Sequence, residues 1–336
     1  MTALGVLWFF LIFLLIAGYF VFDGFDLGAG ILYPFLAKND DERRVIRHSI
    51  GPVWDGNEVW LLTAGGALFA AFAPAYATTF SGFYLAIMLV LFGLILRAVA
   101  VEFVDRDPAW AKLWNACFFV GSLLPALLTG VAVGNIYAGI PLDANGDYAG
   151  FPLLGLVTPF TLLCGLLGLA MFMAAGASWI ALKAPAASDL RVRATAMRRV
   201  LQIVALALFV SVSVFAHFGA HPEMVPGLTV VRFALAGLFV VALAVALAWG
   251  SNPDRDLRVF VLQSAAAVIL VFLLATSMFP NLVVATPLSE GASITVATAA
   301  SSDTALAWMT GIACIGVPIV LFYHVLVYRT FRGRLE

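Results

Sequence analysis

Four acidic side chains interrupt two apolar, glycine-rich segments near the N-terminus. Asp23 and Asp26 lie in GYFVFDGFDLGAG, and Asp55 and Glu58 lie in GPVWDGNEVWLLTAGGALFAAF. Each pair is three residues apart, so the two carboxylates of a pair project from one face of a helix. Because desolvation and mutual repulsion favour the protonated form of at least one carboxyl, neighbouring acids can share or relay a proton. The spacing therefore predicts a proton-transfer role.

A purely structural role remains open for each of these acids. Asp55 follows Pro52 near an expected helix start, where the helix dipole favours a carboxylate. Glu58 could be a core acid that is hydrogen-bonded to a neighbouring helix. Arg97, in LILRAVAVEF, is expected at the same depth as the acids, with Glu102 just beyond it. Arg97 would either compensate their charge or form an ion pair with an anionic group of a partner.

The composition is that of an all-α integral membrane protein. The chain is 63% hydrophobic and 11% charged, with a mean hydropathy of +1.04, whereas soluble domains are about 45–50% apolar and about 25% charged. A transmembrane helix needs about 20 mostly apolar residues. We expect nine spans, near residues 4–36, 50–72, 76–101, 113–137, 159–182, 200–218, 228–249, 259–280 and 304–328. The net charge of −1 gives no indication of a nucleic-acid partner.

The basic residues predict the orientation of these spans. Of the 18 Lys and Arg residues, all but Arg97 and Arg232 fall in alternate loops and in the C-terminal tail. By the positive-inside rule these loops are cytoplasmic, which puts the N-terminus outside and the C-terminus inside. Asp23 and Asp26 come late in an inward-running span, and Asp55 follows the basic segment that ends near Arg47. All four acids are therefore expected in the cytoplasmic half of the membrane.

One basic break divides the chain into two membrane halves. The segment KAPAASDLRVRATAMRR, residues 183–199, separates residues 1–182, which carry the acidic motifs, from residues 200–336. The second half is richer in Ala, Val and Leu, and its ionisable candidates within spans are His217 and His324, both near span ends. We expect the chemistry in the first half and a packing or partner-contact role for the second.

The sequence does not predict a metal or haem site within this chain. Haem ligation in a membrane protein needs His or Met side chains that project into a helix bundle. The four histidines form no pair at matching depth in neighbouring spans; they are His48, His217, His221 and His324. The cysteines each lie alone in an apolar span, which is typical of small buried hydrophobes; they are Cys117, Cys164 and Cys314.

Small and aromatic residues surround the acids. Gly24 and Gly28 are four residues apart, and Gly65 and Gly66 follow the second acidic pair. Small residues in membrane helices let neighbouring helices approach closely, so we expect helix packing at these glycines. Most tryptophans lie near span ends, as interfacial anchors do. Trp60 lies deeper and could line a cavity.

Several segments resemble subunit II of the cytochrome bd quinol oxidases. They are FDGFDLGAG, GPVWDGNEVWLLTAGGALFAAF, SGFYLAIMLVLFGLILRAVAVEF, GVAVGN, MFPNLVVATP and ASITVATAASSDTAL, which together cover nearly the whole chain. The WDGNEVW run is long and chemically unusual, which makes it specific. The related cyanide-insensitive quinol oxidases share these motifs.

The resemblance implies a fold, partners and cofactors. It implies nine helices arranged as two four-helix bundles and one peripheral helix, in a complex of the bacterial cytoplasmic membrane that oxidises quinol and reduces dioxygen to water. Two haems b, one haem d and the quinol-oxidising loop are expected in subunit I, with a small single-helix accessory subunit in some complexes. This chain would ligate no haem and would contain no complete active site.

The resemblance also implies roles for individual residues. Asp55 matches an acid that conducts protons from the cytoplasm, and Asp23 and Asp26 match acids near it. Trp60 matches a position on an apolar route for oxygen, whereas Arg97 and Glu102 match the motif without an assigned role. Two other classes of function remain as alternatives, namely a secondary transporter that uses the carboxylates as ion sites and a scaffold in which every acid is paired and silent.

Overall fold

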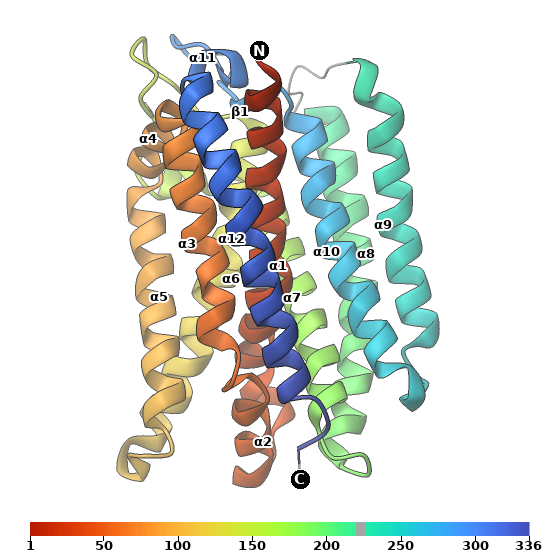
Figure 1. Ribbon diagram of the computed structural model, residues 1–336. Helices are drawn as coiled ribbons and strands as arrows, with labels where there is room; N and C mark the ends of the chain where they lie inside the picture. Colours follow the sequence, from red (N-terminus) through yellow and green to blue (C-terminus); the bar gives the residue numbers. More distant parts are fainter. Residues whose placement is uncertain (220–225, 336) are drawn as a thin grey trace.

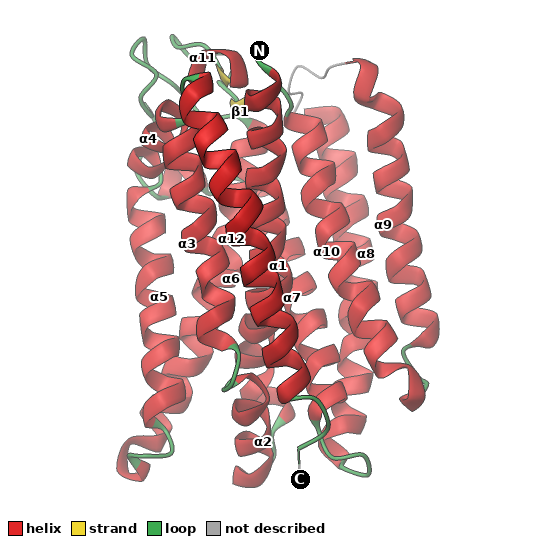
Figure 2. Ribbon diagram, viewed as in Figure 1, coloured by secondary structure: helices red, strands yellow, loops and turns green. Residues whose placement is uncertain are grey.

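The computed structural model describes residues 1–219 and 226–335, and most of these residues are helical (Figures 1 and 2). The chain runs through α1 (Ala3–Leu36), α2 (Asp40–Ile50), α3 (Trp54–Ala71), α4 (Ala73–Gly82), α5 (Tyr84–Phe103), α6 (Ala111–Ala138), α7 (Pro159–Lys183), α8 (Asp189–Gly219), α9 (Thr229–Trp249), α10 (Asp256–Met278), β1 (Asn281–Val283), β2 (Ile294–Thr295), α11 (Val296–Ala299) and α12 (Asp303–Thr330). The long helices lie roughly side by side, with the N-terminus at one end and the C-terminus at the other (Figure 1).

Eight of these helices are long and apolar enough to cross a membrane. α3 is not among them, although it corresponds to the second expected span. It is an 18-residue helix whose first turns carry Asp55, Asn57 and Glu58.

The sequence-based boundaries were wrong in two regions. The expected loop at 183–199 is largely helical, because α8 begins at Asp189 and continues without a break into the expected span at 200–218. The other region lies between residues 50 and 101. The expected span at 76–101 is two helices, α4 and α5, which meet at Phe83. α3 ends at Ala71, and Pro74 occupies the first turn of α4, where its missing N–H costs no helical hydrogen bond. The expected span at 50–72 begins only at Trp54, after a short turn.

The basic segment before that turn is itself helical. The side chain of Asn39 caps α2 by accepting a hydrogen bond from the backbone N–H of Glu42. Acidic residues occupy the first turn of α2, and Arg47 and His48 occupy the last, as the helix dipole favours. A strong cap and well-placed charges explain why this short polar segment is helical.

Close helix crossings at glycine position the centre of the bundle. α1 packs against α3, α6, α7 and α10. A Cβ added at Gly28 would lie 1.9 Å from the carbonyl oxygen of Phe172 on α7, and one at Gly24 would lie 2.7 Å from the Phe172 ring. This confirms the packing role expected for these two glycines. Gly66 has no such packing role within this chain, because no atom lies within 4 Å of a Cβ added there.

The last helix returns to the first half of the chain. α12 crosses in front of α1 and α3 (Figure 1) and contacts both of them. At the N-terminal end of the bundle, β1 pairs antiparallel with β2, and α11 packs against α1 and α4. The division of the sequence at residues 183–199 therefore does not separate α12 from the acidic segments.

Candidate functional site

A buried ion-pair cluster joins α1, α3 and α5. Arg97, which is 1% exposed, donates from Nη2 to Oδ1 of Asp23 at 2.6 Å and also to Oε1 of Glu58. Asp23 is fully buried, whereas the Glu58 side chain is 23% exposed. Of the two roles considered for Arg97, the structure supports charge compensation within the chain. The guanidinium offsets the burial of two carboxylates that come from different helices.

Asp26 belongs to a second, adjoining hydrogen-bond chain. Nδ2 of Asn57 donates to Oδ2 of Asp26 at 2.7 Å, and the hydroxyl of Tyr328 donates to Oδ1 of Asn57 at 3.1 Å. Asp26 is fully buried and Asn57 is 1% exposed. The two acids of α1 are thus three residues apart but have different partners. One pairs with an arginine and the other with a neutral amide.

Several polar atoms of this region have unused hydrogen-bonding capacity. Within the described residues, no partner is present for Oδ1 of Asp26 or for Nε and Nη1 of Arg97. Buried polar groups in proteins are almost always paired with protein atoms or water. Asp26 and Arg97 therefore have hydrogen-bonding capacity that the described residues do not fill.

Trp60 joins this region to α12. Its Nε1 donates to Nε2 of His324 at 3.2 Å, and its ring stacks on Phe22 with centroids 5.3 Å apart. Nδ1 of His324 lies 2.9 Å from the carbonyl oxygen of Val320, so the imidazole carries its proton on Nδ1 and accepts on Nε2. Trp60 is 7% exposed and packs directly against Gly18 of α1. A Cβ added at Gly18 would lie 2.3 Å from the Trp60 ring.

Asp55 and Glu102 lie apart from the buried cluster. Asp55 is exposed, and its Oδ1 accepts a hydrogen bond from the neighbouring backbone N–H of Gly56. Glu102 is half exposed and pairs with Arg106 one helical turn later at 3.4 Å. The structure therefore brings together Asp23, Asp26, Glu58 and Arg97, and places Asp55 on the outer surface of α3.

The described histidines lie on three different helices, α2, α8 and α12. Both ring nitrogens of His324 are engaged, His48 is exposed beside Asp105, and His217 is exposed near the end of α8. His221 lies outside the described residues. Across residues 1–219 and 226–335, no three His, Cys, Asp or Glu side chains are arranged to hold a metal ion.

Sequence reasoning missed Asn57 and Tyr328. Asn57 stands between Asp55 and Glu58 in the WDGNEVW run, and this polar residue in an apolar segment was the available signal. Nothing in the sequence relates Tyr328, at the far end of the chain, to Asp26. The expectation that the chemistry lies in the first half alone needs extending, because α12 supplies Tyr328 and His324.

A separate buried charge cluster in the second half was also missed. Asp256, at the start of α10, is 2% exposed and accepts ion pairs from Arg191 at 2.6 Å, Arg198 at 2.9 Å and Arg334 at 3.2 Å. Arg198 is fully buried and also donates to the carbonyl oxygen of Gly250. This cluster ties α8, α10 and the C-terminal segment together.

Comparison with known proteins decides which kind of membrane protein carries this site. A family model described as cytochrome bd terminal oxidase subunit II matches residues 4–331. The chain belongs to this family. As a subunit II, it is part of an oxidoreductase complex of the bacterial cytoplasmic membrane, which it crosses several times, and it has a subunit I as partner. The cytochrome bd complex as a whole contains haem.

Individual members of the bd oxidase family match along their full length. The chain is 35% identical to cytochrome bd-I ubiquinol oxidase subunit 2 of Escherichia coli K12, over 99% of this chain and 95% of that protein. It is 36% identical to cytochrome bd ubiquinol oxidase subunit 2 of Bacillus subtilis 168, over 100% and 98%. A chain of the bd oxidase structure from Geobacillus thermodenitrificans has the same fold, with a TM-score of 0.77 at 15% identity over 98% of this chain and 99% of that chain.

Proposed function

We propose that this chain is the subunit of a quinol:oxygen oxidoreductase that stabilises the haem-bearing subunit I and delivers protons from the cytoplasm. The observation that carries the proposal is the buried group formed by Asp23, Glu58 and Arg97 with Asp26 beside it. Reduction of oxygen to water consumes protons, so a complex of this class needs polar routes through its apolar helices. The names of the relatives support a quinol as the electron donor of the complex.

A division of roles among the acids follows from their environments. Asp23 and Glu58 share one guanidinium, which compensates one of their two negative charges. Asp26 is paired only with a neutral amide, which makes it the buried acid best suited to bind and release a proton. Asp55 would act at the surface of α3, at the boundary with subunit I.

An exposed stripe of α3 supports contact with subunit I. Asp55, Val59, Leu62, Gly66 and Phe69 follow one another at helical spacing and are all exposed. A carboxylate that faces lipid is unfavourable, which favours a protein cover for Asp55. The open space at Gly66 allows another helix to approach closely. We assign this stripe to the interface with subunit I.

The orientation follows from the end of the bundle at which the basic segments lie. α2, the connection between α7 and α8, and the C-terminus lie at one end in Figure 1, opposite the N-terminus. The positive-inside rule assigns that end to the cytoplasm. We also propose the remaining features of the family for this complex: two four-helix bundles and a peripheral α12, two haems b and one haem d in subunit I, and bound quinol. Trp60 would lie on an apolar oxygen route.

Replacement of the acids in the intact complex tests the proton role. Asp26→Asn and Asp55→Asn should lower oxygen consumption by about 10²-fold, the lower end of the effect of a positioned proton-transfer group. The visible haem spectrum should stay unchanged, because neither residue holds the fold through an ion pair in this chain. Asp41→Asn is the matched control, since Asp41 is a 93% exposed acid at the same end of the bundle.

The scaffold alternative makes the opposite forecast. If none of the acids takes part in proton transfer, both variants should assemble with normal haem content and turn over at the normal rate. Full turnover in Asp26→Asn and Asp55→Asn would therefore reject the proton role and leave subunit I stabilisation as the function of this chain. The transporter alternative has no support from the family assignment.

A further inference from the structure

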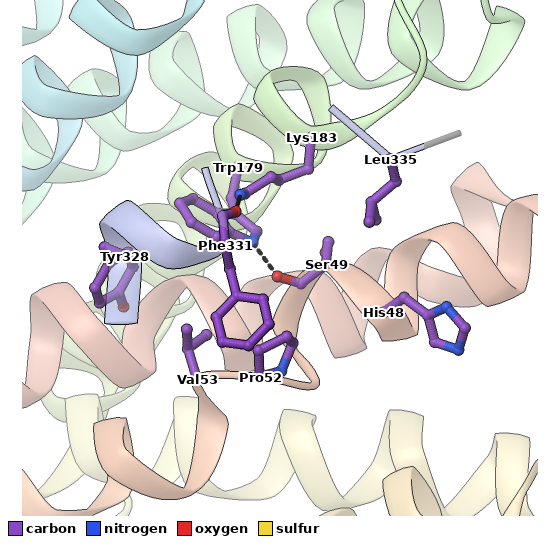
Figure 3. A pocket seen from close by; sticks show the side chains of 9 residues that line it. All are labelled: His48, Ser49, Pro52, Val53, Trp179, Lys183, Tyr328, Phe331 and Leu335. Atoms are coloured by element: carbon purple, nitrogen blue, oxygen red, sulfur yellow. Dashed lines mark hydrogen bonds between the residues drawn. The ribbon is translucent and has the colours of Figure 1, made fainter. Parts of the chain in front are cut away.

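A small cavity lies at the C-terminal end of the bundle, where three distant segments of the chain meet. It has a volume of about 60 Å³, and its walls include Ser49, Trp179, Lys183, Tyr328, Phe331 and Leu335 (Figure 3). At about 30 Å³ per molecule in the liquid, this space holds on the order of two waters. The Lys183 ammonium and the Tyr328 hydroxyl are among the polar groups of its lining. The cavity is therefore large enough for water, and polar residues contribute to a wall that is mostly apolar.

The roof of this cavity is the segment that follows α12, residues 331–335, which we call the C-terminal strap. Nζ of Lys183 donates to the carbonyl oxygen of Phe331 at 2.5 Å, and the N–H of Leu335 donates to the carbonyl oxygen of Lys183 at 2.8 Å. Arg334 donates to the carbonyl oxygens of Ala181 and Ala184, both at 2.9 Å. The strap is thus fastened to the end of α7 by both of its ends.

The inner wall of the cavity leads to Asp26. Tyr328 lines the cavity, and its hydroxyl donates to Oδ1 of Asn57, whose amide donates to Oδ2 of Asp26. The other carboxylate oxygen of Asp26 has no partner within the described part of the chain. An uninterrupted series of polar groups therefore runs from the cavity to the buried acid.

We propose that this cavity is the cytoplasmic entrance for protons that reach Asp26, with Tyr328 as a positioning residue at its inner wall and the C-terminal strap as its lid. The inference rests on the proposed function of Asp26 as a proton carrier. One proton enters from bulk water and is bound by the carboxylate, and no other bond is made or broken. Asn57 has no ionisable proton, so it orients the hydroxyl and the carboxylate, and water carries the proton between them.

This entrance is distinct from Asp55. Asp55 lies on the exposed stripe of α3 that we assign to subunit I, whereas the cavity is enclosed by the turn before α3, the end of α7 and the strap. The two features would supply protons to different faces of α3. Tyr328 is the residue whose replacement separates them.

The test compares Tyr328→Phe with Tyr76→Phe in the purified oxidase complex. Phenylalanine keeps the ring and removes only the hydroxyl, and Tyr76 lies on α4, a helix that does not contact the cavity. Tyr328→Phe should lower turnover at neutral pH by about tenfold or more, with a normal haem spectrum. Because proton uptake becomes limiting, turnover of this variant should then rise steeply as the pH is lowered. Tyr76→Phe should behave as wild type.

The pH profile separates a positioning role from a structural one. A loss of turnover in Tyr328→Phe that is equal at every pH would overturn the proposal, since structural damage does not depend on proton concentration. Wild-type turnover at every pH would also overturn it. If Asp26→Asn is inactive in the same series, only the cavity inference fails. If Asp26→Asn is fully active, the proposed function fails with it.

The lid can be tested by chemical access to the cavity. Ser49 is 5% exposed, so the thiol of a Ser49→Cys variant should react slowly with a water-soluble reagent. Adding Arg334→Ala, which removes the side-chain bonds of the strap to α7 and its ion pair with Asp256, should accelerate this reaction several-fold. Arg332→Ala is the matched control, because Arg332 is an exposed arginine of the same strap. Equal rates in the two backgrounds would refute the lid.

Discussion

Removal of the Arg97 guanidinium should be the most destabilising single change in the buried acid cluster. Arg97→Met keeps the length of the side chain and leaves Asp23 and Glu58 without their shared partner. Breaking a buried pair by removing one partner costs about 3–5 kcal/mol, which is about 10²- to 10⁴-fold in the unfolding equilibrium. With an unfolding entropy of about 2.1 cal/mol/K per residue, the 336 residues give about 0.7 kcal/mol/K, so the expected fall in Tm is about 4–7 °C.

The assay is thermal unfolding of the purified complex in detergent, with Arg106→Met as the control. Arg106 is 71% exposed and pairs with Glu102 at 3.4 Å, and an exposed pair of this kind is worth about 0–1 kcal/mol. Asp23→Asn should restore part of the stability lost in Arg97→Met, because it removes one of the two stranded charges. Equal Tm values for Arg97→Met and Arg106→Met, or strict additivity of Arg97→Met with Asp23→Asn, would refute the reasoning.

Two further predictions concern packing and pH. Gly18→Val should lower the Tm and change the tryptophan fluorescence, because a Cβ on Gly18 would lie 2.3 Å from the Trp60 ring and overpacking costs about 1–3 kcal/mol; Gly237→Val, with nothing within 4 Å, is its control. Burial acts to raise the pKa of Glu42, but a backbone hydrogen bond and the Arg193 guanidinium at 2.6 Å outweigh it and hold the pKa below the usual value of 4.5. The stabilisation from Glu42 is therefore complete above the ordinary Glu pKa and is lost as the pH falls through the lower folded-state pKa. The Tm values of wild type and Glu42→Gln should differ at pH 6 and converge in acid. A difference in Tm that stays constant with pH would contradict this.

Much of the fold was predictable because membrane helices are specified locally. Apolar stretches of the required length indicated the long helices, and the spacing of Gly24 and Gly28 indicated close packing at α1. The break between α4 and α5 was missed, although Ser81 and Gly82 directly precede it and glycine is unfavourable inside a helix. Hydropathy reports where a chain is apolar, and it does not report where a helix stops.

The candidate site was predictable in its residue types and only partly in its arrangement. The four acids stood out because charge is costly in an apolar segment. Their partners could not be predicted from the sequence. Arg97 and Asp23 are 74 positions apart in the chain, and Tyr328 and Asn57 are 271 positions apart. Such contacts depend on which helices become neighbours, and no local pattern encodes that choice.

The sequence by itself determined that this protein is a multi-pass membrane protein of the bd oxidase subunit II type and that its acids are exceptional. The tertiary structure decided which acid has which partner: Asp23 and Glu58 share a guanidinium, Asp26 faces an amide, and Asp55 stays on the surface. The physical reason is that the cost of burying a carboxylate depends on its residue type, whereas its compensation depends on the groups that other helices bring within hydrogen-bond distance.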